Sequence, residues 1–219
     1  MANEADITID EARGLVSDRL LWPRVRDFLW DFAPQVHESW LEPNQLSLRD
    51  SPRVKRYILD SLGVEPCFHA FPNEDGSRIL LLDGSTLESV AKWLGALALS
   101  DSLRRVTSGA SVRELKSALR GIYPEVFGYT AYFREADFQR RDVETQRLED
   151  DVVSTGYGML FSAVAGIPAS LVSRLMLKLP KSLCASEPLR LKERASQTNL
   201  SAVSKLFKLK FPEAYKLCC

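Results

Sequence analysis

The residue types that most often carry covalent or metal chemistry are scarce in this chain. The two histidines, His37 and His69, stand in neither the His-Glu-x-x-His nor the Cys-x-x-Cys context of the common zinc sites. Cys67 and His69 would need a third group to orient the imidazole, and the loop 66–69 contains no acidic residue. The sequence therefore predicts no metal site and no catalytic residue. A small helical enzyme whose site assembles from scattered residues, such as Cys67, His69 and Glu149, stays open as an alternative.

Nucleotide-binding and hydrolytic motifs are also missing from the sequence. The chain has no Gly-x-x-x-x-Gly-Lys-Ser/Thr loop and no Gly-x-Ser-x-Gly elbow. Gly156-Tyr157-Gly158 begins like a dinucleotide fingerprint, but Phe161 occupies the place of the third glycine and no β-α-β pattern surrounds it. The small residues there instead predict that two helices approach each other closely. We expect no cofactor.

The charges of the chain exclude one class of partner and indicate another. Lys plus Arg and Asp plus Glu each number 29, whereas nucleic-acid-binding proteins carry a basic excess. Arg104 and Arg105 are adjacent in an apolar, tightly turned segment. Arginine is favoured at protein interfaces because its planar guanidinium pairs with carboxylates in bidentate geometry. We therefore expect Arg104 and Arg105 to bind a protein partner. The alternative is a solvated face, or an internal ion pair with Glu114 or Glu125.

The cysteines and the N-terminus favour a cytoplasmic location. Cys67, Cys184, Cys218 and Cys219 show no Cys-x-x-Cys spacing, which favours free thiols in a reducing compartment. Residues 1–6 are acidic, whereas a secretory signal begins with basic residues followed by an apolar run. We expect a cytoplasmic protein without a signal peptide.

The elements that position these residues are predicted to be helices. The chain is 45% hydrophobic and 26% charged, as in an ordinary globular protein. Ser51 and Pro52 are typical of a helix start and Gly63 of a helix end. The run 79–82 is the best candidate for a short buried strand. We predict a mostly α fold, a compact irregular helical domain with at most a short strand or hairpin. Other helices are expected around residues 25–32, from capping boxes at Ser85 and Ser111, over 101–107, over 168–180, and from Asn199.

Two apolar stretches are expected to be buried. One is an aromatic cluster, which we assign to the core. The other, 152–173, contains no charged residue, but glycines, serines and Pro168 dilute it below the apolar content of a spanning helix. We predict two buried helices with a break at 166–168, and a peripheral or integral membrane protein stays open as an alternative. The cluster comprises Tyr123, Phe127, Tyr129, Tyr132 and Phe133.

The length and continuity of the sequence favour one domain. A chain of 219 residues can bury a large hydrophobic core, and no internal repeat or low-complexity tract divides it. We predict a single helical domain over 1–219. Within it, 1–84 supplies N-terminal helices and loops, 85–180 the central helical core, and 181–219 a C-terminal helix.

Several short segments carry a family resemblance. They are Trp93–Leu99, Leu103–Val106, Gly109 and Val112–Leu115, then Ser154–Gly156 and Arg174–Pro180, with a weaker echo in Lys205–Phe207 and Phe211-Pro212. Over roughly residues 90–180 the chain resembles the K subunit of bacterial type III secretion systems, the YscK/PscK/SctK family of sorting-platform accessory proteins.

The resemblance implies a non-enzymatic adaptor in protein transport and virulence. In that family the K subunit bridges the cytoplasmic domain of the inner-membrane ring protein and the Q-type subunit of the sorting platform. The implied location is the cytoplasm, at the cytosolic face of the inner membrane when assembled. The implied mechanism is mechanical linkage through two surfaces, without a cofactor, a small-molecule substrate, nucleic acid or direct membrane insertion. The resemblance transfers no individual binding residue.

Overall fold

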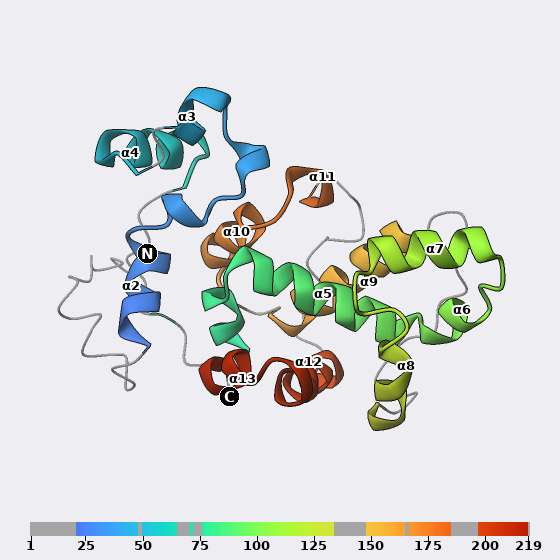
Figure 1. Ribbon diagram of the computed structural model, residues 1–219. Coiled ribbons are helices and arrows are strands. Elements are labelled where there is room, and N and C mark those ends of the chain that lie inside the picture. The colour runs from blue at the N-terminus through green and yellow to red at the C-terminus, as the bar shows by residue number, and fades with distance from the viewer. Residues whose placement is uncertain are drawn as a thin grey trace. The chain divides into compact units, whose positions relative to one another are not determined.

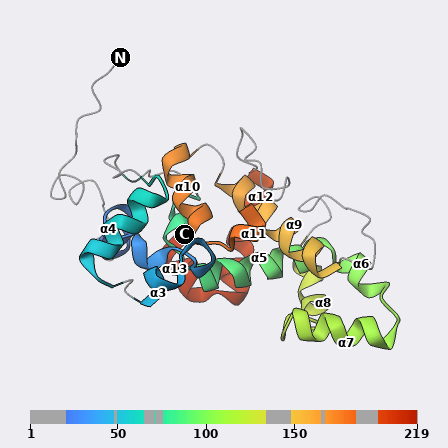
Figure 2. The ribbon, with the colours of Figure 1, turned by 90° about the horizontal axis from the view of Figure 1, so that it is seen from above.

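The computed structural model describes residues 21–47, 50–64, 71, 76–133, 148–164, 167–184 and 197–218. These residues form helices joined by turns, and the described ranges include no strand (Figures 1 and 2). The mostly α prediction is therefore confirmed. Contacts between Cα atoms group the chain into two compact units, which are mainly Met1–Gly84 with Ile167–Cys184 (unit 1) and Ser85–Gly166 with Ala185–Leu217 (unit 2). The single-domain organisation stays a prediction.

Unit 1 is built from short helices, several of which begin at prolines. A proline is tolerated in a first turn because its missing N–H would have no intrahelical partner there. The first helix buries Val25, Phe28 and Leu29, the residues whose spacing predicted it. The elements are α2 (Trp22–Leu29), η1 (Ala33–Gln35), η2 (Glu38–Trp40), α3 (Pro43–Ser47), α4 (Pro52–Ser61), η3 (Ser77–Leu81), α10 (Ala169–Leu177) and α11 (Lys181–Cys184).

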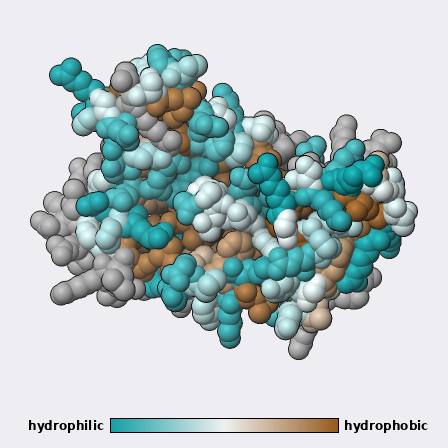
Figure 3. Space-filling view, viewed as in Figure 1, coloured by the Kyte–Doolittle hydropathy of each residue, from teal (hydrophilic) through white to brown (hydrophobic). Residues whose placement is uncertain are grey.

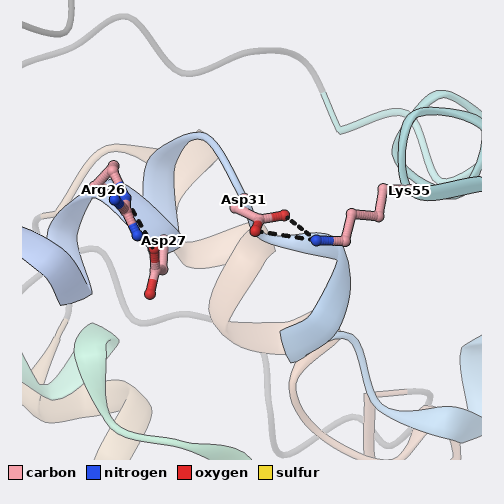
Figure 4. Close-up of polar contacts among 4 residues, drawn as sticks. All are labelled: Arg26, Asp27, Asp31 and Lys55. Carbon is pink, nitrogen blue, oxygen red and sulfur yellow. Dashed lines mark hydrogen bonds and ion pairs between the residues drawn. The ribbon is translucent and has the colours of Figure 1, made fainter. Parts of the chain in front are cut away.

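Helix α4 has one buried side chain and a surface ion pair that links it to the segment after α2. Ile58 is 0% exposed and supplies the apolar contact of α4. Lys55 Nζ lies 3.0 and 3.1 Å from the two carboxylate oxygens of Asp31, and Arg26 pairs with Asp27 at 2.7 Å (Figure 4). Exposed pairs of this kind contribute little to stability. The burial of Ile58 therefore holds α4 more than the Lys55–Asp31 pair does.

Unit 2 is organised around two longer helices and a helix that packs against one of them. Helix α5, which was predicted from the sequence, buries one face that includes Leu87, Val90 and Leu94. Helix α12 packs along α9 and buries Val203, Leu206 and Phe207. The elements are α5 (Gly84–Ala98), α6 (Ser100–Arg104), α7 (Gly109–Ala118), α8 (Val126–Tyr129), η4 (Thr130–Tyr132), α9 (Leu148–Ala163), α12 (Gln197–Lys210) and α13 (Pro212–Cys218).

Helices α5 and α9 cross in backbone contact at two glycines. A Cβ added to Gly95 would lie 1.8 Å from the carbonyl oxygen of Val152, and one added to Gly156 would lie 1.8 Å from that of Ala91. No side chain fits at either position, because both obstacles are helix backbone. The prediction that small residues near Gly156 let two helices approach closely is confirmed. Gly158 has no atom within 4 Å of its added Cβ and plays no part in the crossing.

Several local predictions are wrong. The apolar run 79–82 does not form a strand, because Ser77–Leu81 is a 3₁₀ helix in which Ile79, Leu80 and Leu81 are buried. Ser85 and Ser111 are not N-caps, since α5 already begins at Gly84 and α7 at Gly109, with Ser108 at the N-cap of α7. Asn199 likewise lies inside α12, which begins at Gln197. A short apolar run and a serine near a helix start each fit more than one local structure.

The uncharged stretch 152–173 forms parts of two helices, as predicted. Helix α9 ends at Ala163, and Pro168 stands at the N-cap of α10. Val152, Leu160 and Leu171 are at most 2% exposed. None of the helices that the described residues form is long and apolar enough to span a lipid bilayer.

Candidate protein-binding surface

Short helices of unit 2 place Arg104 and Arg105 at the protein surface. Leu99, Leu103 and Val106 are buried and fix the path of α6. The two arginines stand between these anchors, and both are exposed. The helical periodicity of α6 therefore explains why a double arginine stands in an apolar segment: the leucines face inward and the arginines face solvent.

The Arg104 guanidinium is held in one orientation by three neighbours. Its Nη2 donates a hydrogen bond of 2.9 Å to Thr130 Oγ1, and its Cζ lies 5.4 Å from the ring centroid of Phe127. Its Nη1 lies 3.8 Å from Asp101 Oδ1. The side chain is still 51% exposed. An arginine fixed in this way loses little further freedom when it binds a carboxylate, which favours affinity. Glu125, the predicted intramolecular alternative, pairs with Lys210 instead.

The aromatic cluster predicted for the core lies mostly at the surface. Only Phe133 is buried, at 8% exposure, whereas Tyr132 is 55% exposed. Ile122 and Val126, spaced i and i+4, take the buried positions, so the aromatic residues next to them are displaced to the rim. The half-buried members are Tyr123, Phe127 and Tyr129.

The rings of this segment form contacts with one another and with Arg104. Tyr123 stacks edge-on against Phe127 with centroids 5.4 Å apart, and Tyr129 and Tyr132 are 6.1 Å apart. Apolar and hydrophilic side chains alternate over this part of unit 2 (Figure 3). Hot spots of protein interfaces are enriched in aromatic residues and arginine, as this segment is. We call Arg104, Phe127, Tyr129 and Tyr132, with Arg105, the arginine–aromatic surface.

Lys210 anchors the arginine–aromatic surface to the body of unit 2. Its Nζ lies 4.7 Å from the ring centroid of Trp93 and 4.9 Å from that of Tyr129, and it donates a hydrogen bond to Glu125. The hydrogen bond to Glu125 raises the pKa of Lys210, so the ammonium stays charged at neutral pH. Tyr129 also stacks edge-on against Trp93 at 5.4 Å. The α8 segment is therefore tied to α5 and α12, which keeps its rings in place.

Unit 1 contains two buried cations that the sequence analysis did not assign to any site. Lys178 is 1% exposed and donates hydrogen bonds to the carbonyl oxygens of Leu80 at 2.7 Å and Leu82 at 2.9 Å. Arg174 is 2% exposed and donates at 2.8 Å to the carbonyl oxygen of Phe28. These carbonyls lie at the C-terminal ends of η3 and α2, where helices leave acceptors without intrahelical partners. The two cations are therefore caps for the ends of helices.

Aromatic rings and nearby charges complete the surroundings of Lys178. Its Nζ lies 4.8 Å from the ring centroid of Phe28 and 6.0 Å from that of Phe32. Burial lowers the pKa of Lys178 to about 7, an effect that Asp83 opposes and Arg24 reinforces. A lowered lysine pKa is often a sign of catalysis. Here the geometry gives a structural reason, since the amine is saturated by carbonyls and rings.

A signal for these cations was present in the sequence. Leu171, Arg174, Leu175 and Lys178 follow the i, i+3, i+4, i+7 spacing of one helix face, so Lys178 falls on the inward side of α10. Charged residues on an apolar face predict buried partners. The sequence predicted a helix over 168–180, but no role was predicted for its two cations.

Of the other residues considered for chemistry, the structure describes the side chain of His37. His37 caps η2, since its Nδ1 accepts a hydrogen bond of 3.1 Å from the backbone N–H of Ser39. Cys67 and His69, and the side chain of Glu149, lie outside what the structure describes. Among the residues that it does describe, no group of three or more His, Cys, Asp or Glu side chains is placed to hold a metal ion.

The fold and this surface define a class: a helical protein with buried basic side chains at helix ends and an exposed arginine–aromatic surface. Comparison with protein families identifies the chain within that class. The family model described as YOP proteins translocation protein K (YscK) matches residues 25–218. The chain belongs to the YscK family and is a type III secretion protein. The match extends well beyond the roughly 90–180 of the resemblance. No curated protein and no solved structure is significantly similar to the chain.

Proposed function

We propose that this protein is a non-enzymatic adaptor of the type III secretion sorting platform. It bridges the cytoplasmic domain of the inner-membrane ring protein and the Q-type platform subunit, at the cytosolic face of the inner membrane. The observation that carries the proposal is the YscK family match over residues 25–218. The polar chemistry of the described residues is consistent with it, because their buried cations cap helices and their exposed arginine is preorganised for binding.

Two separate surfaces are the physical requirement of a bridge. The chain folds into two compact units, each with its own buried core. In unit 2 the arginine–aromatic surface is the candidate for one partner, with Arg104 and Arg105 supplying donors for carboxylates. Unit 1 exposes Tyr57 at 60% and Leu46 at 40%, which are large apolar side chains outside its core. We assign one partner to each unit.

The test is whether the protein makes two other proteins co-elute. The ring-protein cytoplasmic domain and the Q-type subunit from the same organism are passed through size exclusion in pairs and as a three-component mixture. A bridge predicts that the two partners elute together only when the full chain is present. Separate elution of all three proteins would refute the adaptor function. Measurable turnover of any substrate by the purified chain would count against its non-enzymatic character.

The role of Arg104 and Arg105 is tested with a charge-matched control. The Arg104→Ala, Arg105→Ala variant is expected to lose one partner and keep the other. The control replaces Lys208 and Lys216, which are exposed on α12 and α13, with alanine and removes the same charge. Retention of both partners by the arginine variant would exclude these two residues from the interface.

A further inference from the structure

Helix α7 carries a second set of basic residues that the contacts described above do not use. Arg113, Lys116 and Arg120 are spaced i, i+3 and i+7, so they follow one another along one side of α7 and the turn after it. All three side chains are exposed. Leu115 and Leu119, at 5% and 0% exposure, take the inward side instead. We call Arg113, Lys116 and Arg120 the α7 basic face.

The described residues around the α7 basic face supply no acid that pairs with it. Within the described part of the chain, none of the three cations takes part in an ion pair. Other exposed cations do find acids, as Lys216 does with Glu213 at 2.8 Å. A row of like charges one turn apart is mildly unfavourable for the isolated helix. The contacts of the described residues therefore give no structural reason for this row.

The segment that contains α7 is basic although the chain is neutral. Residues 100–121 hold five Lys or Arg and two Asp or Glu, a net charge of five minus two, or +3. One of the two acids, Asp101, already lies 3.8 Å from Arg104. Helices α6 and α7 lie at the same end of α5 (Figures 1 and 2). A compact positive field attracts a negative partner.

We propose that the α7 basic face binds an acidic segment of a protein partner. The row spans seven residues, about 10 Å at the rise of an α-helix, which matches carboxylates one and two turns apart on a partner helix. Two of its three cations are arginines, whose guanidinium groups bind carboxylates in bidentate geometry. Nucleic acid and anionic membranes are less suitable ligands, because three cations with Glu114 among them neutralise few phosphates. The proposal rests on the proposed function, because the acidic partner is expected to be one of the two proteins that the adaptor bridges.

The experiment reverses the charge of the row in the full chain. Affinities of the wild type, the Arg113→Glu, Arg120→Glu variant and the Lys208→Glu, Lys216→Glu control are measured for the ring-protein cytoplasmic domain and the Q-type subunit by calorimetry. We expect the first variant to lose about tenfold or more in affinity for one of the two proteins, since like charges then face each other. The control changes the net charge equally and is expected to bind as the wild type does.

Two further measurements separate binding from folding and from general electrostatics. The exchanged side chains are all exposed, so the variants are expected to unfold close to the wild-type temperature. The control also loses the Lys216–Glu213 ion pair, which contributes little because both side chains are exposed. Wild-type affinity is expected to fall as salt rises from about 50 to about 500 mM, and the Arg113→Gln, Arg120→Gln variant is expected to show a smaller salt dependence. An unchanged salt dependence in that variant would contradict the proposal.

The remaining outcomes are distinguishable. A complex that forms with both proteins and is unaffected by the charge reversal overturns this inference and leaves the adaptor function standing. Failure of wild type to bind either protein overturns both. Equal losses in the variant and the control mean that net charge alone acts, which also overturns the inference. The inference is also overturned if the wild type binds phosphatidylglycerol-containing vesicles or duplex DNA, the charge reversal of the row abolishes this binding, and the affinities for both proteins are unchanged.

Discussion

The crossing of α5 and α9 makes a sharp prediction, because two glycines on the same helix differ completely in their surroundings. In Gly156→Ala the new Cβ would lie 1.8 Å from the Ala91 oxygen, 2.5 Å from its carbonyl carbon and 3.0 Å from its Cα. All three atoms are backbone of α5 and have no rotamer to change. The helices must separate by more than 1 Å, roughly the difference from an ordinary carbon–oxygen contact. In Gly158→Ala no atom lies within 4 Å.

The two substitutions are therefore expected to have opposite signs. Forcing a methyl group into a packed interface lowers the free energy of unfolding by about 1–3 kcal/mol. Because the contact at Gly156 is with rigid backbone, we expect the loss in Gly156→Ala to lie at or above the upper end of this range. Replacing a helical glycine with alanine returns about 1 kcal/mol of helix propensity in both variants. We expect a net loss of about 2 kcal/mol or more for Gly156→Ala and a gain of up to about 1 kcal/mol for Gly158→Ala.

Thermal unfolding followed by far-ultraviolet circular dichroism measures the difference directly. For a chain of this size, 1 kcal/mol moves the midpoint by about 2–4 °C. The unfolding midpoint is expected to fall by about 4 °C or more in Gly156→Ala. In Gly158→Ala the midpoint is expected to rise by up to about 2–4 °C. Gly95→Ala, on the other side of the crossing, should behave like Gly156→Ala. Equal midpoints for the two α9 variants, or a rise in Gly156→Ala, would refute the close backbone crossing.

Three further predictions concern unit 1. Since burial lowers the pKa of Lys178 to about 7 while a lysine in the unfolded chain titrates at about 10.4, the unfolded chain binds more protons between these pH values. The contribution of Lys178 to the free energy of unfolding should thus rise from pH 7 to 10, by up to about 1.4 kcal/mol per pH unit, and Lys178→Met should flatten this rise in urea titrations. Arg174→Met leaves a buried carbonyl without its donor and is expected to lose about 1–3 kcal/mol in urea unfolding, whereas Arg26→Met should leave the urea midpoint unchanged because Arg26 is a surface residue. Ile58→Ala should lose about 2–5 kcal/mol in the same measurement, and Tyr57→Ala on the exposed side of α4 should leave the midpoint nearly unchanged.

The sequence predicted helix existence and most of the buried faces, because proline, glycine and apolar periodicity act locally. Pro52 and Gly63 bracket α4, and Pro168 precedes α10, as expected. Errors occurred where one pattern fits several structures. The run 79–82 is apolar throughout, so it carries no period that separates a strand from a 3₁₀ helix.

The candidate surfaces were harder to predict than the helices, because they depend on which residues of a segment are buried in the folded protein. The aromatic cluster was assigned to the core from its residue types and their helical spacing. Ile122 and Val126 occupy the inward face of that segment, so Tyr132 stays 55% exposed. The contacts of Arg104 with Thr130 and Phe127 join residues more than twenty positions apart. No spacing rule within one helix predicts such a contact, so the sequence indicated the arginine but not its preorganisation.

The residues that carry the family resemblance separate into two kinds once their surroundings are known. Gly95, Gly156, Arg174 and Lys178 have structural roles, since they allow a backbone crossing or cap buried helix ends. Arg113 belongs to the same pattern, yet it is exposed and without an ion pair among the described residues. A variant of the first kind is expected to lower the affinity for every partner, because it destabilises the fold. A variant of Arg113 is expected to leave the fold intact. Loss of a single partner without loss of stability is therefore the signature that separates the binding surface from the scaffold.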